Sequence, residues 1–143
     1  MTKTTMGINP ILRGSITGLL ASVPMGMATM MLGLISGLGF TEPLRLIASA
    51  LMGQAAFSGT LPLVLGLLLH MMTGAVLGIL YGLLVKPEVS TPLLGIVFGL
   101  GVWVVATISL GYVAPIMAQN MPYWLFALAH AVYGLTLAVI FRR

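Results

Sequence analysis

The sequence predicts an all-α membrane protein, a bundle of four transmembrane helices with a short amphipathic helix on the outer side. Of its 143 residues 59% are hydrophobic and only 6% are charged, whereas about 25% of residues are charged in a soluble domain. Six basic and two acidic residues cannot provide the polar surface that such a domain needs in water. Four apolar stretches reach the roughly 20 residues that a helix needs to cross the hydrocarbon core.

We expect one membrane domain over residues 1–143, with spans at residues 14–35, 61–85, 92–117 and 122–141. The first span is too long for the apolar part of a cleavable signal peptide, so we expect an uncleaved helix. Pro24 and Pro115 lie inside the first and third spans. Each removes a backbone hydrogen bond, so we expect kinks, which either only curve the bundle or widen its interior near the level of the histidines.

The segment between the first two spans predicts a helix that does not cross the membrane. Thr41 is a favourable N-cap, Glu42 suits the positive end of a helix, and Pro43 suits the first turn. Residues 44–57 follow, and they are too few and too mixed in character to span. We expect this helix to lie along the outer membrane surface or to dip back into the bundle.

The distribution of basic residues predicts the orientation. With four spans, both termini and the loop after the second span lie on one side. That side carries Lys3, Arg13, Lys86, Arg142 and Arg143, and the other side carries Arg45. Because Lys and Arg concentrate in cytoplasmic loops, we expect both termini to be cytoplasmic and the protein to lie in the inner (cytoplasmic) membrane.

The second and fourth spans share the pattern Pro-x7-His-x3-Gly. The second span places His70 and Gly74 after its proline, and the fourth places His130 and Gly134 at the same spacing. Alternate spans run parallel, so both histidines are expected at one depth, about 12 Å along the helix from their prolines. The pattern indicates a duplicated two-helix hairpin, a kind of parallel repeat found in membrane proteins.

Small residues follow each histidine at steps of four. On the second span they are Gly74, Gly78 and Gly82, and on the fourth they are Gly134 and Ala138. Small residues at this spacing let helix backbones approach each other in lipid. We therefore expect both histidines to face neighbouring helices. The first and third spans carry matching pairs near their inner ends, Gly14-x3-Gly18 and Gly95-x3-Gly99.

Two imidazoles at one depth on parallel helices suggest a haem or metal site at His70 and His130, because neutral imidazole is a good ligand for iron and copper. The layout is similar to that of the cytochrome b four-helix bundle, whose second and fourth helices carry facing histidines. That resemblance implies a haem b, or a chlorin, bound by these histidines with Gly74 and Gly134 beside it. Arg45 is the outer-side cation available to a haem propionate.

Two other interpretations stay open. In one, each histidine only donates a hydrogen bond to a backbone carbonyl or to a hydroxyl of a neighbouring helix. In the other, methionines take part in binding copper, since thioethers and imidazole suit Cu(I). Met27-x3-Met31 is similar to the methionine pair of Ctr-type copper transporters, although methionine also serves as a flexible filler between helices.

A further resemblance rests on His70-Met-Met-Thr-Gly74 and His130-Ala-Val-Tyr-Gly134. A histidine followed by glycine on the second and fourth spans looks like the pattern of small bacterial membrane proteins of the YagU-like group. The resemblance covers these two spans and implies no activity.

The acidic residues narrow the range of functions. Glu42 and Glu88 both lie outside the spans, which argues against an ion-coupled carrier and against acid–base catalysis by paired carboxylates. The scattered basic residues form no nucleic-acid surface. We expect a protein that is not an enzyme: an accessory subunit of a larger respiratory or photosynthetic electron-transfer complex, partnered by other membrane subunits or by its own copies. The alternative is a small carrier or channel for a metal ion or a neutral solute.

Overall fold

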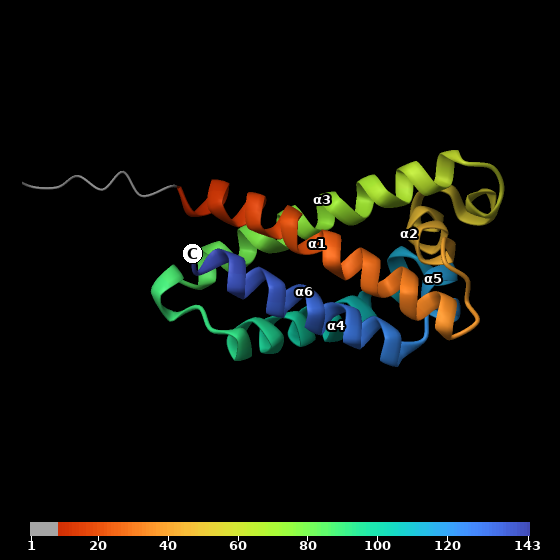
Figure 1. Cartoon of the computed structure of the whole chain (residues 1–143). Helices are drawn as coiled ribbons and strands as arrows, with labels where there is room; N and C mark the ends of the chain where they lie inside the picture. Colours follow the sequence, from red (N-terminus) through yellow and green to blue (C-terminus); the bar gives the residue numbers. More distant parts are fainter. Residues whose placement is uncertain (1–8) are drawn as a thin grey trace, which may run out of the picture.

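The computed structural model describes residues 9–143. Within this range the chain forms helices and no strands (Figure 1). The α-helices are α1 (Pro10–Ile35), α2 (Glu42–Met52), α3 (Leu61–Leu84), α4 (Pro92–Val113), α5 (Pro115–Asn120) and α6 (Tyr123–Phe141), with short 3-10 helices η1 (Gly53–Phe57) and η2 (Pro87–Val89). Among them α1, α3, α4 and α6 are long and apolar enough to cross a membrane. The predicted all-α bundle with four such helices is confirmed.

The first span is longer than predicted. Helix α1 begins at Pro10, four residues before the expected start at residue 14. The Asn9 side chain accepts a hydrogen bond from the backbone N–H of Ile11 at 2.9 Å, and Pro10 occupies the first turn, where its missing N–H costs nothing. A polar cap and a proline thus start the helix ahead of the apolar run.

The third span ends earlier than residue 117. Helix α4 stops at Val113, and Pro115 begins the separate helix α5. The cause is local, because a residue before proline is disfavoured in the α region. Ala114 takes φ −143° and ψ 67°. Pro115 therefore terminates the span instead of kinking it, whereas Pro24 does lie inside α1.

The helix between the first two spans forms at the predicted place. Helix α2 starts at Glu42, after Thr41, although the Thr41 side chain makes no capping hydrogen bond. Its end at Met52 is followed by η1, so the predicted helix is split in two. Both α2 and α5 lie at the end of the bundle away from the C-terminus (Figure 1).

The four long helices make an incomplete ring of contacts. Helix α1 packs against α3 and α6, and α4 packs against α6. Helices α3 and α4 have few direct contacts. Among them is an edge-to-face pair of the Tyr81 and Phe98 rings, with centroids 5.0 Å apart. At the other end α2 packs on α3 and also touches α5. The bundle is consequently closed on three sides and loosely joined on the fourth.

Glycines bring the packed helices into backbone contact. A Cβ on Gly18 of α1 would collide with the carbonyl oxygen of Gly74 on α3. Likewise, a Cβ on Gly99 of α4 would collide with the carbonyl oxygen of His130 on α6. Such close approach stabilises helix pairs in lipid, where the hydrophobic effect does not drive association.

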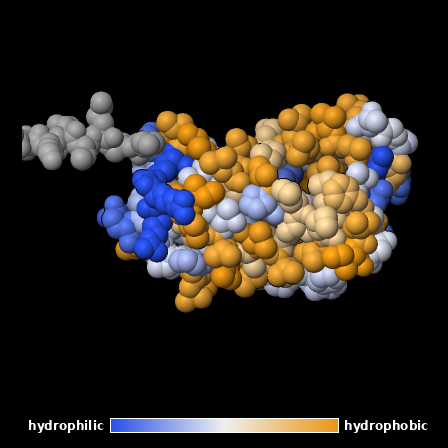
Figure 2. Space-filling view, in the orientation of Figure 1, coloured by the Kyte–Doolittle hydropathy of each residue, from blue (hydrophilic) through white to orange (hydrophobic). Residues whose placement is uncertain are grey.

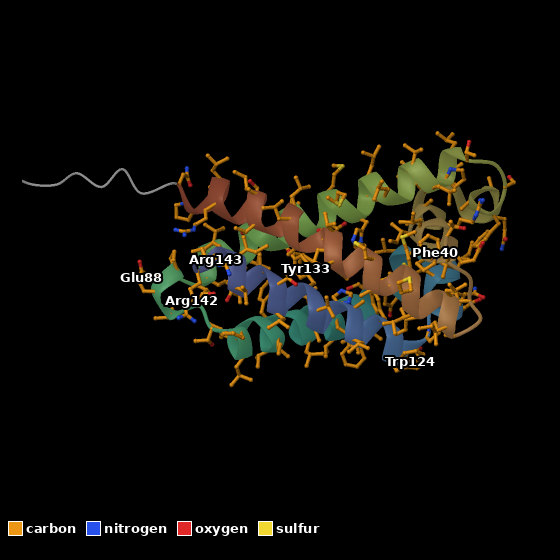
Figure 3. The ribbon with its side chains drawn as sticks, in the orientation of Figure 1. Phe40, Glu88, Trp124, Tyr133, Arg142 and Arg143 are labelled. Carbon is orange, nitrogen blue, oxygen red and sulfur yellow. The ribbon has the colours of Figure 1, made fainter. Side chains whose placement is uncertain are left out.

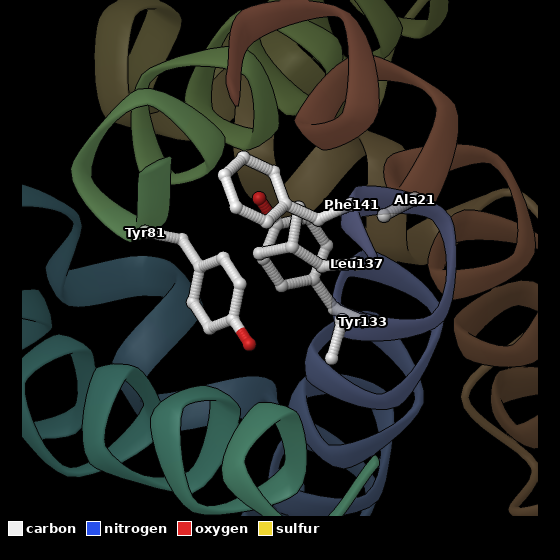
Figure 4. Close-up of a cluster of buried hydrophobic side chains, with 6 residues drawn as sticks. Ala21, Tyr81, Tyr133, Leu137 and Phe141 are labelled. Carbon is white, nitrogen blue, oxygen red and sulfur yellow. The ribbon is translucent and has the colours of Figure 1, made fainter. Parts of the chain in front are cut away.

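A cluster of buried side chains fills the half of the bundle near the C-terminus; its members include Ala21, Tyr81, Tyr133, Leu137 and Phe141 (Figure 4). The Tyr133 hydroxyl donates to the carbonyl of Gly74 at 2.7 Å. The Tyr81 and Ser90 hydroxyl oxygens are 2.9 Å apart. Because Ser90 donates its own hydrogen to the carbonyl of Ala138 at 3.0 Å, Tyr81 is the donor to Ser90. Each of these buried hydroxyls is thereby satisfied.

The outer surface of the helices is apolar between two more polar ends (Figure 2). Glu88, Arg142 and Arg143 lie at one end, and Phe40 and Trp124 lie toward the other (Figure 3). Large exposed side chains along the helices include Ile16, Leu68, Val105 and Ile108. An apolar band over helices of spanning length suits a lipid bilayer, so the protein is a membrane protein.

Candidate functional site

A cavity of about 750 Å³ lies in the half of the bundle near α2 and α5. All six α-helices contribute to its lining. The four long helices form its walls, and α2 and α5 cover the end away from the C-terminus. This volume is in the range of small-molecule sites, roughly 300–1,000 Å³.

The cavity opens sideways, between α3 and α4. Five of its lining residues on these two helices are also exposed at the protein surface: Thr73, Leu80, Gly101, Val105 and Val113. Val105, for example, is 65% exposed. These residues form the rim of an opening that faces the same surroundings as the apolar outer surface. A molecule can therefore reach the cavity from lipid without crossing the bundle.

The lining is apolar apart from two hydroxyls and two imidazoles. The polar side chains are Thr29, Thr73, His70 and His130, and no charged residue is present. The apolar part includes four methionines, Met25, Met30, Met117 and Met121. Such a surface suits an uncharged, largely apolar molecule with few polar groups.

His70 projects from α3 toward α1. Its Nε2 lies 2.9 Å from the backbone carbonyl oxygen of Ser22. Since a carbonyl only accepts, Nε2 carries the proton and donates it. A Cβ on Gly26 would lie 3.1 Å from Nε2 and 3.5 Å from Cδ2, so this glycine makes room for that edge of the ring. The lone pair of the neutral imidazole is left on Nδ1, on the opposite edge.

His130 is bound within its own helix. Its Nδ1 lies 2.8 Å from the carbonyl oxygen of Phe126, one turn earlier on α6, so Nδ1 is the donor. The Phe126 ring packs edge to face on the imidazole, with centroids 4.4 Å apart. His130 is 5% exposed. Its lone pair is on Nε2.

Both lone-pair nitrogens belong to residues that line the cavity. Within residues 9–143 neither His70 Nδ1 nor His130 Nε2 has a protein hydrogen-bond partner. In the same range, the buried side-chain nitrogen and oxygen atoms that lack a partner are Trp103 Nε1 and Thr107 Oγ1. The two imidazole nitrogens are therefore not sealed inside the protein, and both residues line the cavity. The structure brings His70 and His130 to one shared space.

The other predicted site residues lie elsewhere. Gly74 and Gly134 pack against the backbones of α1 and α4 and are not part of the lining. Arg45 donates to the carbonyls of Ala56 at 3.0 Å and Gly59 at 3.1 Å, and its Nε lies 3.6 Å from Glu42. It thus fixes the turn after α2.

The methionines of the cavity are not the pair that the sequence suggested for copper. Met27 and Met31 are 64% and 51% exposed on the outer surface of α1. Across residues 9–143, no group of three or more His, Cys, Asp or Glu side chains is placed to hold a metal ion.

The described residues do not fit a haem b held between the two histidines. Each ring donates one N–H to a backbone carbonyl, as metal-ligating histidines usually do. However, His70 presents Nδ1, which lies beside its own Cβ, so its side chain would crowd a flat macrocycle. Haem propionates also need cations or water around them, and the lining is without charge.

Sequence reasoning missed Gly26, the Ser22 carbonyl and Gly101. Gly26 has a weak signal, because it stands two residues after Pro24, which was expected near the histidine level. Gly101 stands out only in the structure. Nothing lies within 4 Å of a Cβ placed on it, so no contact within the protein explains a glycine there.

No protein-family model, no curated protein and no solved structure matches this chain.

Proposed function

We propose that the protein binds a small, uncharged, mostly apolar molecule that enters its cavity from the lipid, as a carrier or membrane-embedded binding protein for a neutral solute. The observation that carries this proposal is the cavity between α3 and α4, which is open to the side and presents two imidazole lone pairs within an apolar lining. Apolar walls supply affinity, and a few polar atoms fix orientation.

Gly101 supports this role. Glycine in a helix interior costs about 1 kcal/mol relative to alanine, and most spanning glycines here offset that cost by close backbone contact. Gly101 lines the cavity and has open space around it. Gly111 of the same helix has equally open space away from the cavity, so it is the place of Gly101 in the lining that leaves room for a bound molecule against the α4 backbone.

The orientation proposed from the basic residues places the cavity in the outer half of the inner membrane. Arg13, Lys86 and Arg142 lie at the end where α1 begins and where α3 and α6 finish. Helices α2 and α5 are at the opposite end. With the basic end cytoplasmic, the solute would enter and leave through the outer leaflet.

A second candidate function is the accessory subunit. It is favoured by α4, a helix of 22 residues in which Gly95 and Gly99 are the buried ones, both on the side facing α6. A transmembrane helix of a partner subunit, or a second copy of this chain, would cover the exposed side of α4 together with the opening of the cavity.

Cavity filling tests the proposal. The Gly101→Phe variant places a ring in the cavity, and Gly111→Phe is the matched control, because Gly111 lies on the same helix, has equally open space and does not line the cavity. The proteins are extracted with their surrounding lipid by an amphipathic polymer, and the bound molecules are identified by mass spectrometry. We expect a small molecule to co-purify with wild type and Gly111→Phe and to be lost from Gly101→Phe.

Equal small-molecule content in all three proteins would refute the binding role. If the material lost from Gly101→Phe is instead a polypeptide in fixed ratio to the chain, the accessory subunit is the correct function.

A further inference from the structure

We infer that the cavity selects a molecule bearing a hydroxyl group, an alcohol or a phenol, over the corresponding ether or ketone. This inference rests on the proposed function, because it concerns the chemical class of the solute bound at the same site. It follows from which atoms of the lining still have protons to donate and which have only lone pairs.

The two imidazoles act as acceptors. His70 has committed its N–H to Ser22 and His130 its N–H to Phe126, at 2.9 and 2.8 Å. A neutral imidazole has one N–H and one lone pair. Each ring therefore keeps one nitrogen that can accept a hydrogen bond and cannot donate one, and both rings line the cavity.

The hydroxyls of the lining add to this bias. Thr29 donates its hydrogen to the carbonyl of Met25 at 2.8 Å, so its oxygen can offer only lone pairs. Thr73, at the rim, is the one remaining hydroxyl of the lining, and it can turn to donate or accept. The lining thus has three groups that can only accept a hydrogen bond, the two imidazoles and Thr29, and one hydroxyl, Thr73, that can also donate.

A solute hydroxyl satisfies this arrangement. Its O–H can donate to His130 Nε2 or His70 Nδ1, which otherwise remain unpaired in an apolar space at a cost. An ether or ketone of the same shape brings only lone pairs and cannot pair with either nitrogen. One net hydrogen bond of ordinary strength corresponds to a preference of roughly fivefold for the hydroxyl compound.

The lack of charged side chains in the lining also favours a neutral hydroxyl compound. The lining is without Asp, Glu, Lys or Arg, so an ammonium or a carboxylate would be desolvated without a partner, which is far costlier than burying a hydroxyl. The donor is therefore expected on a neutral molecule.

The test compares 4-octylphenol with its methyl ether, 4-octylanisole, which keeps the oxygen and the chain and lacks the O–H. Binding to the full chain in nanodiscs is measured and referred to the concentration of each compound in the bilayer. We expect wild type to bind the phenol at least fivefold more tightly than the ether. His70→Phe/His130→Phe should lose this preference, whereas Ser109→Ala, which removes a hydroxyl outside the cavity, should keep it.

Each outcome bears on one claim. If wild type binds phenol and ether equally well and Gly101→Phe loses both, the cavity is a ligand site and the hydroxyl inference is wrong. If Gly101→Phe binds both as wild type does, the proposed function itself fails. If the double histidine variant keeps the preference, another group recognises the hydroxyl and the role of the imidazoles is refuted. The wild-type comparison stands even if that variant does not fold.

Discussion

His70 and His130 occupy equivalent places in the sequence pattern but are held differently. His70 donates across to α1, at Ser22, and exposes Nδ1, while His130 donates within α6, at Phe126, and exposes Nε2. The difference follows from their neighbours, since Gly26 leaves room on α1 for the His70 ring. A pair that looks identical in sequence thus presents two different ring edges to one cavity.

This difference yields a prediction for haem binding. We expect protein purified from haem-supplemented cells to show no haem b absorption in a reduced-minus-oxidised spectrum, because His70 offers its crowded nitrogen and no cation lines the cavity. An absorption band that disappears in both His70→Ala and His130→Ala would show that the haem interpretation is correct.

At the scale of helices, two glycines of α4 separated by a single residue have opposite roles. Gly99 faces the carbonyl of His130, where an added Cβ has no room, whereas Gly101 faces open space. One glycine joins α4 to α6 and the other borders the cavity. The surrounding helices, and not the helix propensity of glycine, decide what each one does.

Alanine substitutions separate these roles. Gly99→Ala should destabilise the protein by about 1–3 kcal/mol, the usual cost of overpacking. Gly101→Ala should be neutral or stabilise it by up to about 1 kcal/mol, because alanine favours the helix. The measurement is unfolding by SDS titration in mixed micelles, followed by circular dichroism. Equal destabilisation by the two variants would contradict the packing of α4 on α6.

The sequence alone predicts the four long helices, but it predicts neither the junctions between helices nor the cavity. Spans of apolar residues follow directly from the solvent that they must face, so α1, α3, α4 and α6 were predictable. The sequence does not predict the break at Ala114, because Pro115 is tolerated both inside and at the start of a helix. The Ser22 partner of His70 is 48 residues away, and only the packed helices reveal it.

At the scale of the whole molecule, the two ends of the bundle differ in the number of basic residues that they carry. Glu88, Arg142 and Arg143 lie at one end (Figure 3). Arg13 lies at the same end, with its guanidinium carbon 5.4 Å from the Phe141 ring centroid. The opposite end carries Arg45, engaged with the loop after α2. This asymmetry is the basis for the proposed cytoplasmic location of both termini.

The absence of cysteine from the sequence allows a direct test of orientation. Ser58→Cys, before α3, and Glu88→Cys, after α3, both place a thiol at an exposed position. In bacterial spheroplasts we expect a membrane-impermeant maleimide to label Ser58→Cys at once and Glu88→Cys only after permeabilisation. The reverse pattern would invert the orientation, and labelling of both from one side would mean that α3 does not cross the membrane.

The Tyr81–Phe98 contact determines where α3 and α4 are joined directly and where they are not. It joins α3 directly to α4 at one level, and His70 lies about 16 Å further along α3. Beyond that level the two helices are connected through α2 and α5, which touch each other. These short helices therefore act as a spacer between α3 and α4. If the cavity binds a solute as proposed, a small shift of α2 against α5 would change the width of the gap and the size of the solute that fits.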